Sequence, residues 1–308
     1  MNVLDTLVPN PVNGVWKTIA QNPLTRDQKA QAILRFIQWQ IGSRVLDNPV
    51  AIPFVEGTRL LLERGMTGAT GNIYAGLHEF EGMSFALHAL RPSSWFVDIG
   101  ANVGMYTVLA GGAAGSSCVA AEPVPATYES LCDNVRLNDL SNRVDCRNVG
   151  VGKEKGDLQF TETAKSGGNR VLQEAAPSSG TKVDVTALDT LLKEPTSSDD
   201  VLVIKIDVEG WEAAVLEGGK SVLSRSSPTA LLVELNGWGE RYGFDDNKAH
   251  MDLVSKGYTP VNYDPIQRQF EKRNNRCKKG NTIYVNNFGF FRKKVENSRM
   301  YKVIGKKI

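Results

Sequence analysis

Residues 95–104 read WFVDIGANVG, the most informative stretch of the chain. It begins with a short apolar run that is typical of a buried strand and passes through an acid into a turn with two glycines. The following residues, YTVLA at 106–110, favour a helix. Because glycines let the backbone approach a ligand closely at a helix N-terminus, we expect a nucleotide-type ligand here. The turn alone is not specific, since dehydrogenases, flavoproteins and ligand-free tight turns also use one.

The alternation of strand and helix continues after this turn. Strand-like runs follow at 117–121, 144–149, 201–206 and 230–235, helical runs lie at 126–137, 212–216 and 246–255, and further strands are expected near Tyr258 and Ile283. Parallel strands with crossover helices follow from this rhythm. The sequence therefore predicts an α/β, doubly wound, Rossmann-like fold with helices on both faces of a mostly parallel sheet.

Two other parts of the chain depart from this rhythm. The first ninety or so residues read as helical: Thr25 to Gln28 form a capping-box pattern before an apolar stripe at 30–41, helices are expected over 58–64 and 79–90, and the glycine-rich 68–76 reads as a loop. Between 150 and 200 we expect an insertion with a hairpin at 157–161, a Gly/Ser-rich loop and a strand at 182–186. Both parts lie outside the core pattern.

Composition restricts the class of protein. The 308 residues are 41% hydrophobic and 23% charged, which is ordinary for a globular chain of one to one and a half domains. We find no apolar run of about 18 residues and no signal-peptide pattern, so we expect a cytoplasmic protein without a membrane span. The four cysteines are too widely spaced for a zinc site and are expected to be reduced thiols.

Charge is distributed unevenly along the chain. The net charge is +2, but 13 of the 36 Lys and Arg residues lie from Arg268 onward, against only two of the 34 acids there. The body is therefore acidic and the C-terminal segment basic. A basic tail suits a solvated end, nucleic acid, or a patch for anionic lipid or glycan carriers.

An acid also closes the second core strand. Glu122 lies about twenty residues beyond the glycine turn, where a carboxylate can accept both hydroxyls of a ribose; the alternative is a solvent-facing acid. Asn102 stands where a pyrophosphate-binding turn usually has its next glycine, and Asp98 precedes the turn. This departure from the dinucleotide pattern favours a cationic amino-acid group at Asp98.

A third motif, IKIDVEGWE at residues 204–212, places Asp207 at the carboxyl end of a central strand, at the crevice where open α/β sheets bind ligands. Strand alternation puts Lys205 and Asp207 on one face, so we expect an ion pair in the core for Lys205 rather than a catalytic role. For Asp207 we expect a place in the site.

These three segments together resemble the FkbM family of S-adenosylmethionine-dependent methyltransferases. The family patterns VDIGANxG and IKIDVEGxExxVLxG lie within close matches at 97–104 and 203–219, and the acid followed by proline that ends the second strand is at 122–123. The resemblance extends over roughly 71–285, and its combination of motifs is more specific than any one of them. It implies a seven-stranded sheet, so we divide the chain into a helical N-terminal cap (1–93), a methyltransferase domain (94–287) and a basic tail (288–308).

The resemblance also implies site residues. Asp98, Gly100, Asn102 and Gly104 would surround the methionine part of S-adenosylmethionine, Glu122 would bind its ribose, and Tyr74 and Glu79 would reach its amino-acid end. S-adenosylhomocysteine would be the product. Asp207 is expected to contact the cofactor as well.

Methyl transfer from a sulfonium to a hydroxyl is an in-line displacement that needs alignment and removal of a proton. We expect Asp207 to act as the base or to orient the acceptor, and Glu209 either to bind the acceptor or to cap the next helix. Magnesium held by Asp207, Glu234 and Asn236 is an alternative that we do not favour, and His250 is an alternative base.

No residue identifies the acceptor. By resemblance we favour O-methylation of a small molecule or glycan, first a sugar hydroxyl, with Trp211, Trp238 and Tyr242 as stacking candidates. The alternatives are an RNA methyltransferase that uses the basic tail, a catalytically silent cofactor-binding module, and a nicotinamide oxidoreductase. Nucleic acid is the less favoured partner, because the sequence lacks the Pro-Pro-aromatic motif of base amino-methyltransferases, and the sequence gives no oligomeric state.

Overall fold

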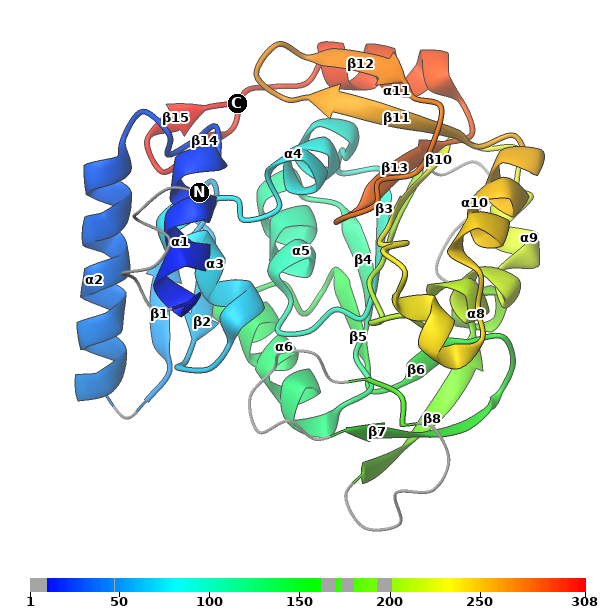
Figure 1. Ribbon diagram of the computed structural model, residues 1–308, viewed down its shortest axis with the longest axis horizontal. Coiled ribbons are helices and arrows are strands. Elements are labelled where there is room, and N and C mark those ends of the chain that lie inside the picture. The colour runs from blue at the N-terminus through cyan, green and yellow to red at the C-terminus, as the bar shows by residue number, and fades with distance from the viewer. Residues whose placement is uncertain (1–9, 47, 162–169, 173–179, 193–200) are drawn as a thin grey trace.

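The computed structural model describes residues 10–46, 48–161, 170–172, 180–192 and 201–308 (Figure 1). A central sheet of eight strands runs through the molecule, with the strand order β12-β11-β13-β10-β9-β3-β4-β5. Its strands are β3 (Trp95–Ile99), β4 (Ser117–Ala121), β5 (Val144–Arg147), β9 (Leu202–Ile206), β10 (Thr229–Val233), β11 (Thr259–Asp264), β12 (Gln269–Lys272) and β13 (Thr282–Val285).

The five strands from β10 to β5 are parallel, whereas β13 is antiparallel to both β10 and β11. This arrangement confirms the Rossmann-like fold. The sheet has one strand more than the expected seven, because residues 269–272 fold back on β11 as an antiparallel edge strand.

Side-chain alternation along the strands produces two separate cores. Phe96 and Val203 face a layer built from α4 (Phe80–Ala89), α5 (Met105–Val108), a π-helical continuation η2 (Leu109–Ala114), α6 (Pro125–Leu137) and α11 (Phe288–Glu296). Val97 and Ile204 face the other layer, built from α7 (Leu188–Leu191), α8 (Glu212–Glu217), α9 (Lys220–Leu223) and α10 (Asp246–Ser255). The helices expected over 79–90, 126–137, 212–216 and 246–255 are confirmed.

The N-terminal segment packs beside the core and is less helical than expected. It consists of α1 (Asn10–Gln21), α2 (Lys29–Val45), a hairpin of β1 (Val50–Pro53) and β2 (Arg59–Leu62), and α3 (Thr67–Ala75). The helix expected over 58–64 is wrong, because Leu60 and Leu62 alternate onto one buried face of a strand. The loop expected over 68–76 is also wrong, because α3 buries Ala69 and Ala75 against its neighbours.

The predicted capping box does not form. Thr25 is buried and its hydroxyl donates to the carbonyl oxygen of Ile19 at 2.8 Å, while α2 begins after Gln28 without a side-chain cap. The local sequence pattern is therefore overridden by a contact with the preceding helix.

The expected insertion forms a small second sheet with the order β6-β8-β7, from β6 (Gly150–Gly152), β7 (Gly156–Thr161) and β8 (Gly180–Ala187). The hairpin strand and the strand near 182–186 are confirmed. The Gly/Ser-rich loop falls mainly on 162–169 and 173–179, outside the described residues.

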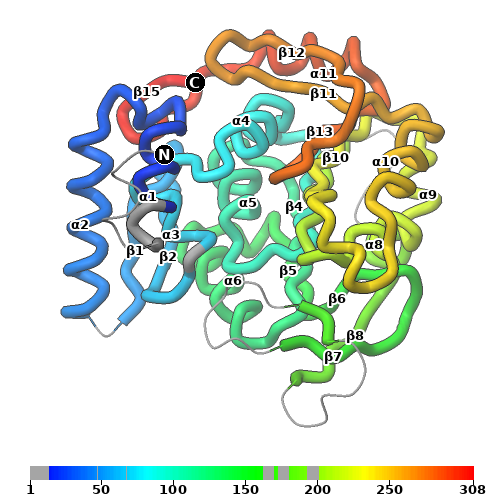
Figure 2. Tube along the Cα trace, in the orientation of Figure 1, coloured from blue at the N-terminus to red at the C-terminus, as the bar shows by residue number. Residues whose placement is uncertain are grey.

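The basic C-terminal segment is folded onto the rest of the molecule. Beyond α11, a short hairpin of β14 (Lys302–Val303) and β15 (Lys306–Lys307) lies against the N-terminal segment, near the loop that follows α1 (Figure 2). Val303 forms a bridge with Val55, and the backbone N–H of Lys302 donates to Glu56. The interpretation of this segment as a solvated end is therefore wrong, because Phe291, Val303 and Ile308 are buried.

No helix among the described residues is long and apolar enough to span a bilayer.

We expect Phe291→Ala to lower the free energy of unfolding by about 3–5 kcal/mol, because this fully buried ring joins α11 to the main core. Met300→Ala, at a 55% exposed position in the same segment, is the control and should change it by less than about 0.5 kcal/mol. Urea denaturation followed by circular dichroism measures both. Equal stability of the two variants would show that the tail is not part of the cooperative core.

Candidate functional site

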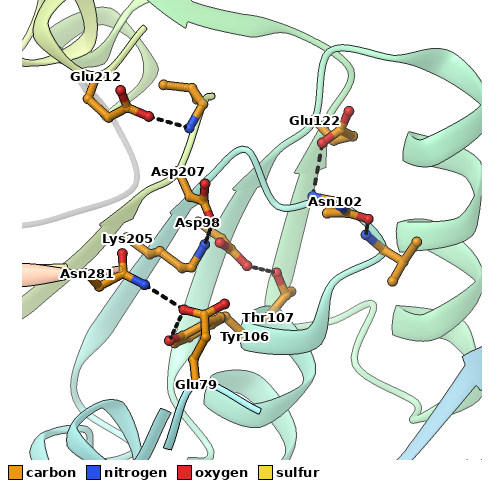
Figure 3. A network of polar contacts seen from close by, with 12 residues as sticks. Glu79, Asp98, Asn102, Tyr106, Thr107, Glu122, Lys205, Asp207, Glu212 and Asn281 are labelled. Atoms are coloured by element: carbon orange, nitrogen blue, oxygen red, sulfur yellow. Dashed lines mark hydrogen bonds and ion pairs between the residues drawn. The ribbon is translucent and has the colours of Figure 1, made fainter. Parts of the chain in front are cut away.

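A cavity of about 350 Å³ lies at the carboxyl ends of β3, β4 and β9. This is the edge at which open α/β sheets bind ligands, and the volume is in the range of small-ligand sites. Among the predicted site residues, those lining the cavity are Glu79, Asp98, Gly100, Asn102, Glu122, Asp207 and Glu209, and Lys205, Trp211 and Trp238 join them. The structure thus brings together segments that are more than a hundred residues apart (Figure 3).

The glycine turn is required by close backbone contacts. Gly100 has a φ of +76°, and a Cβ there would lie 2.0 Å from the carbonyl oxygen of Asp207. Gly104 also has positive φ, but it does not line the cavity: a Cβ there would lie 2.6 Å from the side chain of Leu131 on α6. Gly100 therefore lets two strand ends meet at the cavity, whereas Gly104 lets a helix pack behind it.

Glu122 is held in place by the backbone of both neighbouring loops. One carboxylate oxygen accepts from the N–H of Asn102 at 2.9 Å (Figure 3). The other accepts from the N–H of Val124 at 3.1 Å. Burial raises the pKa of Glu122 to about 7. Asn102 itself has a φ of +52°, so the turn is fixed in a left-handed conformation directly beside this carboxylate.

Asp98 is almost fully buried at the end of β3. Its carboxylate accepts a hydrogen bond from the hydroxyl of Thr107 at 2.6 Å, and it is the register partner of Lys205 on β9. Burial raises the pKa of Asp98, an effect that the Lys205 charge opposes.

The expected ion pair is confirmed. The Nζ of Lys205 lies 2.7 Å from Oδ2 of Asp207 and 4.9 Å from the centre of the Tyr106 ring. Although burial alone would lower it, the carboxylates of Asp207, Glu79 and Asp98 raise the pKa of Lys205. The lysine is therefore the charged centre of an acidic group of side chains.

Glu79 closes this group from the N-terminal side. Its Oε2 accepts hydrogen bonds from the hydroxyl of Tyr106 at 3.0 Å and from the amide of Asn281 at 2.5 Å. The pattern around the first strand gave no indication of Asn281, because it comes from the far end of the chain. The Oδ1 of this amide is buried without a protein partner.

The charges of this cluster do not balance. Three carboxylates, those of Glu79, Asp98 and Asp207, surround the single ammonium of Lys205, and all four groups line the cavity. An excess of buried negative charge favours a cationic ligand. The cavity is thus suited to a group such as a sulfonium or an α-ammonium.

Glu209 and Glu212 are close in sequence, but only Glu209 lines the cavity. Glu212 is buried, and its Oε1 accepts from the N–H groups of Val208 and Gly210, so this residue and not Glu209 stabilises the turn before α8. Glu209 has a φ of +57° and lines the cavity. Burial, together with the charge of Asp207, raises the pKa of Glu209 to about 7.

Some predicted residues lie elsewhere. Tyr74 does not line the cavity; it packs edge-on against Phe36 in a cluster of the N-terminal segment. His250 is buried on α10, with its Nδ1 3.0 Å from the hydroxyl of Tyr284. Tyr242 packs against Trp211, with ring centres 5.1 Å apart, beside the cavity lining.

Of the three oxygen ligands considered for magnesium, Glu234 interacts with both Asp207 and Asn236. Glu234 follows β10, and burial together with the charges of Asp207 and Glu79 raises its pKa to about 7. Asn236 uses its Oδ1 to accept from the N–H of Trp238. Among the residues that the structure describes, no three His, Cys, Asp or Glu side chains are arranged to hold a metal ion.

We expect Lys205→Met to lower the free energy of unfolding by about 3–5 kcal/mol at pH 8, because it leaves buried carboxylates without a counter-charge. The folded-state pKa values of these carboxylates should then rise above their unfolded values, so the loss should shrink as pH falls and protons neutralise them. Urea denaturation at pH 8 and pH 5.5, compared with the wild type at each pH, measures this. The double variant Lys205→Met/Asp207→Asn should recover part of the loss; no recovery would mean that the lysine acts through packing alone.

Comparisons with known proteins agree with these motifs. The model "Methyltransferase FkbM domain" matches residues 98–260, more than half of the chain. "Methyltransferase 1" of Beauveria bassiana is 30% identical in a match that covers 41% of this chain and 58% of that protein. "Methyltransferase sdnD" of Sordaria araneosa is also 30% identical, in a match that covers 42% of this chain and 61% of that protein. The matched regions thus span about three fifths of these curated relatives.

Solved structures show weaker similarity. An FkbM methyltransferase from Methylobacillus flagellatus is 15% identical, with 83% of this chain and 60% of that one covered at a TM-score of 0.43. An RNA methyltransferase from Salinibacter ruber, solved with S-adenosylhomocysteine, is 12% identical, with 66% and 86% covered at a TM-score of 0.31. The matched range, residues 98–260, includes Asp98, Glu122 and Asp207 of the cavity, and the chain belongs to the FkbM methyltransferase family.

Proposed function

We propose that the protein transfers a methyl group from S-adenosylmethionine to a hydroxyl of a small molecule or glycan, with a sugar hydroxyl as the first choice. The observation that carries this proposal is the acidic cavity at the strand ends, in which Glu79, Asp98 and Asp207 outnumber Lys205. Such a cavity favours a ligand that carries positive charge.

The side chains present fit this cofactor. Glu122 is fixed by two backbone N–H groups and retains lone pairs on both oxygens for ribose hydroxyls. Asp98 and the turn at Gly100 and Asn102 would adjoin the methionine part, with Glu79 at its ammonium end. When bound, S-adenosylmethionine supplies the activated methyl group. The assignments of Tyr74 and Gly104 have no support in the geometry, since neither residue lines the cavity.

The chain would supply the base and the alignment. Glu209 is our preferred base, because a carboxyl with a pKa of about 7 can accept a proton from the acceptor hydroxyl near neutral pH. Asp207, fixed by Lys205, would orient that hydroxyl. The acceptor would enter beside Trp238, which is 44% exposed and lines the cavity, and whose ring offers a stacking surface.

The folded C-terminal segment favours a small acceptor over nucleic acid. Tyr301, an aromatic residue of the basic segment, is buried and packs against Arg299 and His88, so it is not free to stack on a base. We propose residues 94–287 as the catalytic domain, with the N-terminal segment contributing Glu79 and Gly68 to the cavity wall.

Glu209→Gln should lower kcat/KM by about 100-fold or more, because it removes the proposed base. In the wild type, kcat/KM should rise with pH up to about 7 and then level off. Release of S-adenosylhomocysteine with an accepted substrate measures both, and Glu240→Gln, at an exposed position, is the control. Full turnover of Glu209→Gln would leave Asp207 as the remaining candidate, to be tested in Asp207→Asn.

Affinity for S-adenosylmethionine should depend on the ionisation of Glu122. Because the ionised form accepts from ribose hydroxyls and its pKa is about 7, the dissociation constant should rise roughly tenfold between pH 8 and pH 6. In Glu122→Gln, affinity should be weaker at pH 8 and its pH dependence reduced. Calorimetric titration measures this, with the exposed Glu129→Gln as control. An unchanged pH profile in Glu122→Gln would remove the ribose assignment.

A further inference from the structure

A second pocket, of about 380 Å³, adjoins the acidic cavity. It is lined by Arg170, Val171, Leu172, Arg241 and Tyr242. Val171 lines both spaces, so the pocket and the cavity share a wall. The pocket therefore lies where the part of an acceptor remote from the reacting hydroxyl would be placed.

The two arginines are held by different parts of the fold. The backbone of Arg170 is bonded to Thr161 of β7 in both directions, at 2.9 and 3.1 Å. The guanidinium of Arg241 lies 4.9 Å from the ring centre of Trp238, in η3 (Trp238–Tyr242). The hydroxyl of Tyr242 donates to the carbonyl oxygen of Val171 at 2.9 Å and so joins the two segments.

Among the described residues, neither guanidinium group is engaged in a short ion pair, although that of Arg241 also interacts with the hydroxyl of Tyr242 and the ring of Trp238. Within the described part of the chain, neither Arg170 nor Arg241 forms an ion pair within 4.0 Å, although both side chains are exposed and line one pocket. By contrast, Arg136 and Arg147 on the surface pair with acids at 2.6 Å. Two arginines that line one pocket without an acid in direct contact are suited to carboxylate or phosphate, which they can bind through two parallel hydrogen bonds.

Charge is thus separated along the site. The inner cavity holds an excess of carboxylates, and the adjoining pocket holds two cations. The boundary runs through Glu209, whose carboxyl senses the charges of both Arg241 and Arg170. A cationic donor and an anionic acceptor would each be directed to its own compartment, with the hydroxyl between them.

We propose that the pocket of Arg170 and Arg241 binds an anionic group, a phosphate or a carboxylate, on the methyl acceptor. The proposal rests on the methyltransferase function proposed above and specifies its substrate class: a hydroxylated small molecule with one acidic group. Trp238 would lie between the anion and the reacting hydroxyl, with one face already covered by Arg241.

The test compares three matched sugars as probes: glucose 6-phosphate, glucuronate and glucose. They are titrated into the full chain saturated with S-adenosylhomocysteine at constant ionic strength and followed by the indole NMR signal of Trp238, assigned with Trp238→Phe. At least one anionic sugar should bind at least tenfold more tightly than glucose. Arg170→Gln and Arg241→Gln should each weaken that binding about tenfold. Arg136→Gln, whose guanidinium pairs with Asp133 on another surface, is the matched control.

The outcomes separate the two proposals. Preference for the phosphate or for the carboxylate identifies the anion. Binding of all three sugars with equal affinity, no binding of any, or equal affinity in the arginine variants and the control would overturn the anion site. Affinity for S-adenosylmethionine, measured in the same variants, should stay within twofold of the wild type. If the chain bound the anionic sugars and no S-adenosylmethionine, the methyltransferase proposal would fail while the anion site stood.

Discussion

The ion pair between Lys205 and Asp207 is the interaction on which the rest of the site depends. It places the cation of β9 beside Asp98 of β3 through the strand register and beneath the ring of Tyr106, whose hydroxyl in turn orients Glu79. A buried lysine is tolerated here because several carboxylates share it. The same carboxylates exceed its charge, so the arrangement that makes the core electrostatically acceptable also leaves a cavity that favours a cation.

Backbone proximity is the second constraint. The loop after β3 contacts the end of β9 so closely that only glycine fits at position 100, and Gly210 meets the carbonyl of Trp238 in the same way, with a Cβ distance of 2.7 Å. Three loops from different strands are thereby held together without side chains between them. The acidic cavity and the arginine pocket occupy the space that these loops leave.

Much of the core could be predicted from the sequence, because β3, β4, β9 and β10 are largely apolar runs with an acid at or just after the end of each. Prediction failed where tertiary packing decides the structure. Residues 58–64 contain helix-compatible leucines, but burial of Leu60 and Leu62 on one face selects a strand. Tyr74 belongs to a motif near the site in sequence, yet α3 turns it toward Phe36. The contact of Asn281 with Glu79 joins distant segments, and so does the shared pocket of Arg170 and Arg241. No local sequence pattern indicates either one.

The acidic cavity should select a cationic methyl donor over other nucleotide ligands. Calorimetric titration of the wild-type chain with S-adenosylmethionine, beside NAD under the same conditions, tests it most directly. We expect micromolar binding of S-adenosylmethionine and no measurable binding of NAD, whose pyrophosphate would face the carboxylates of Glu79, Asp98 and Asp207. Binding of NAD, or no binding of S-adenosylmethionine, would contradict it.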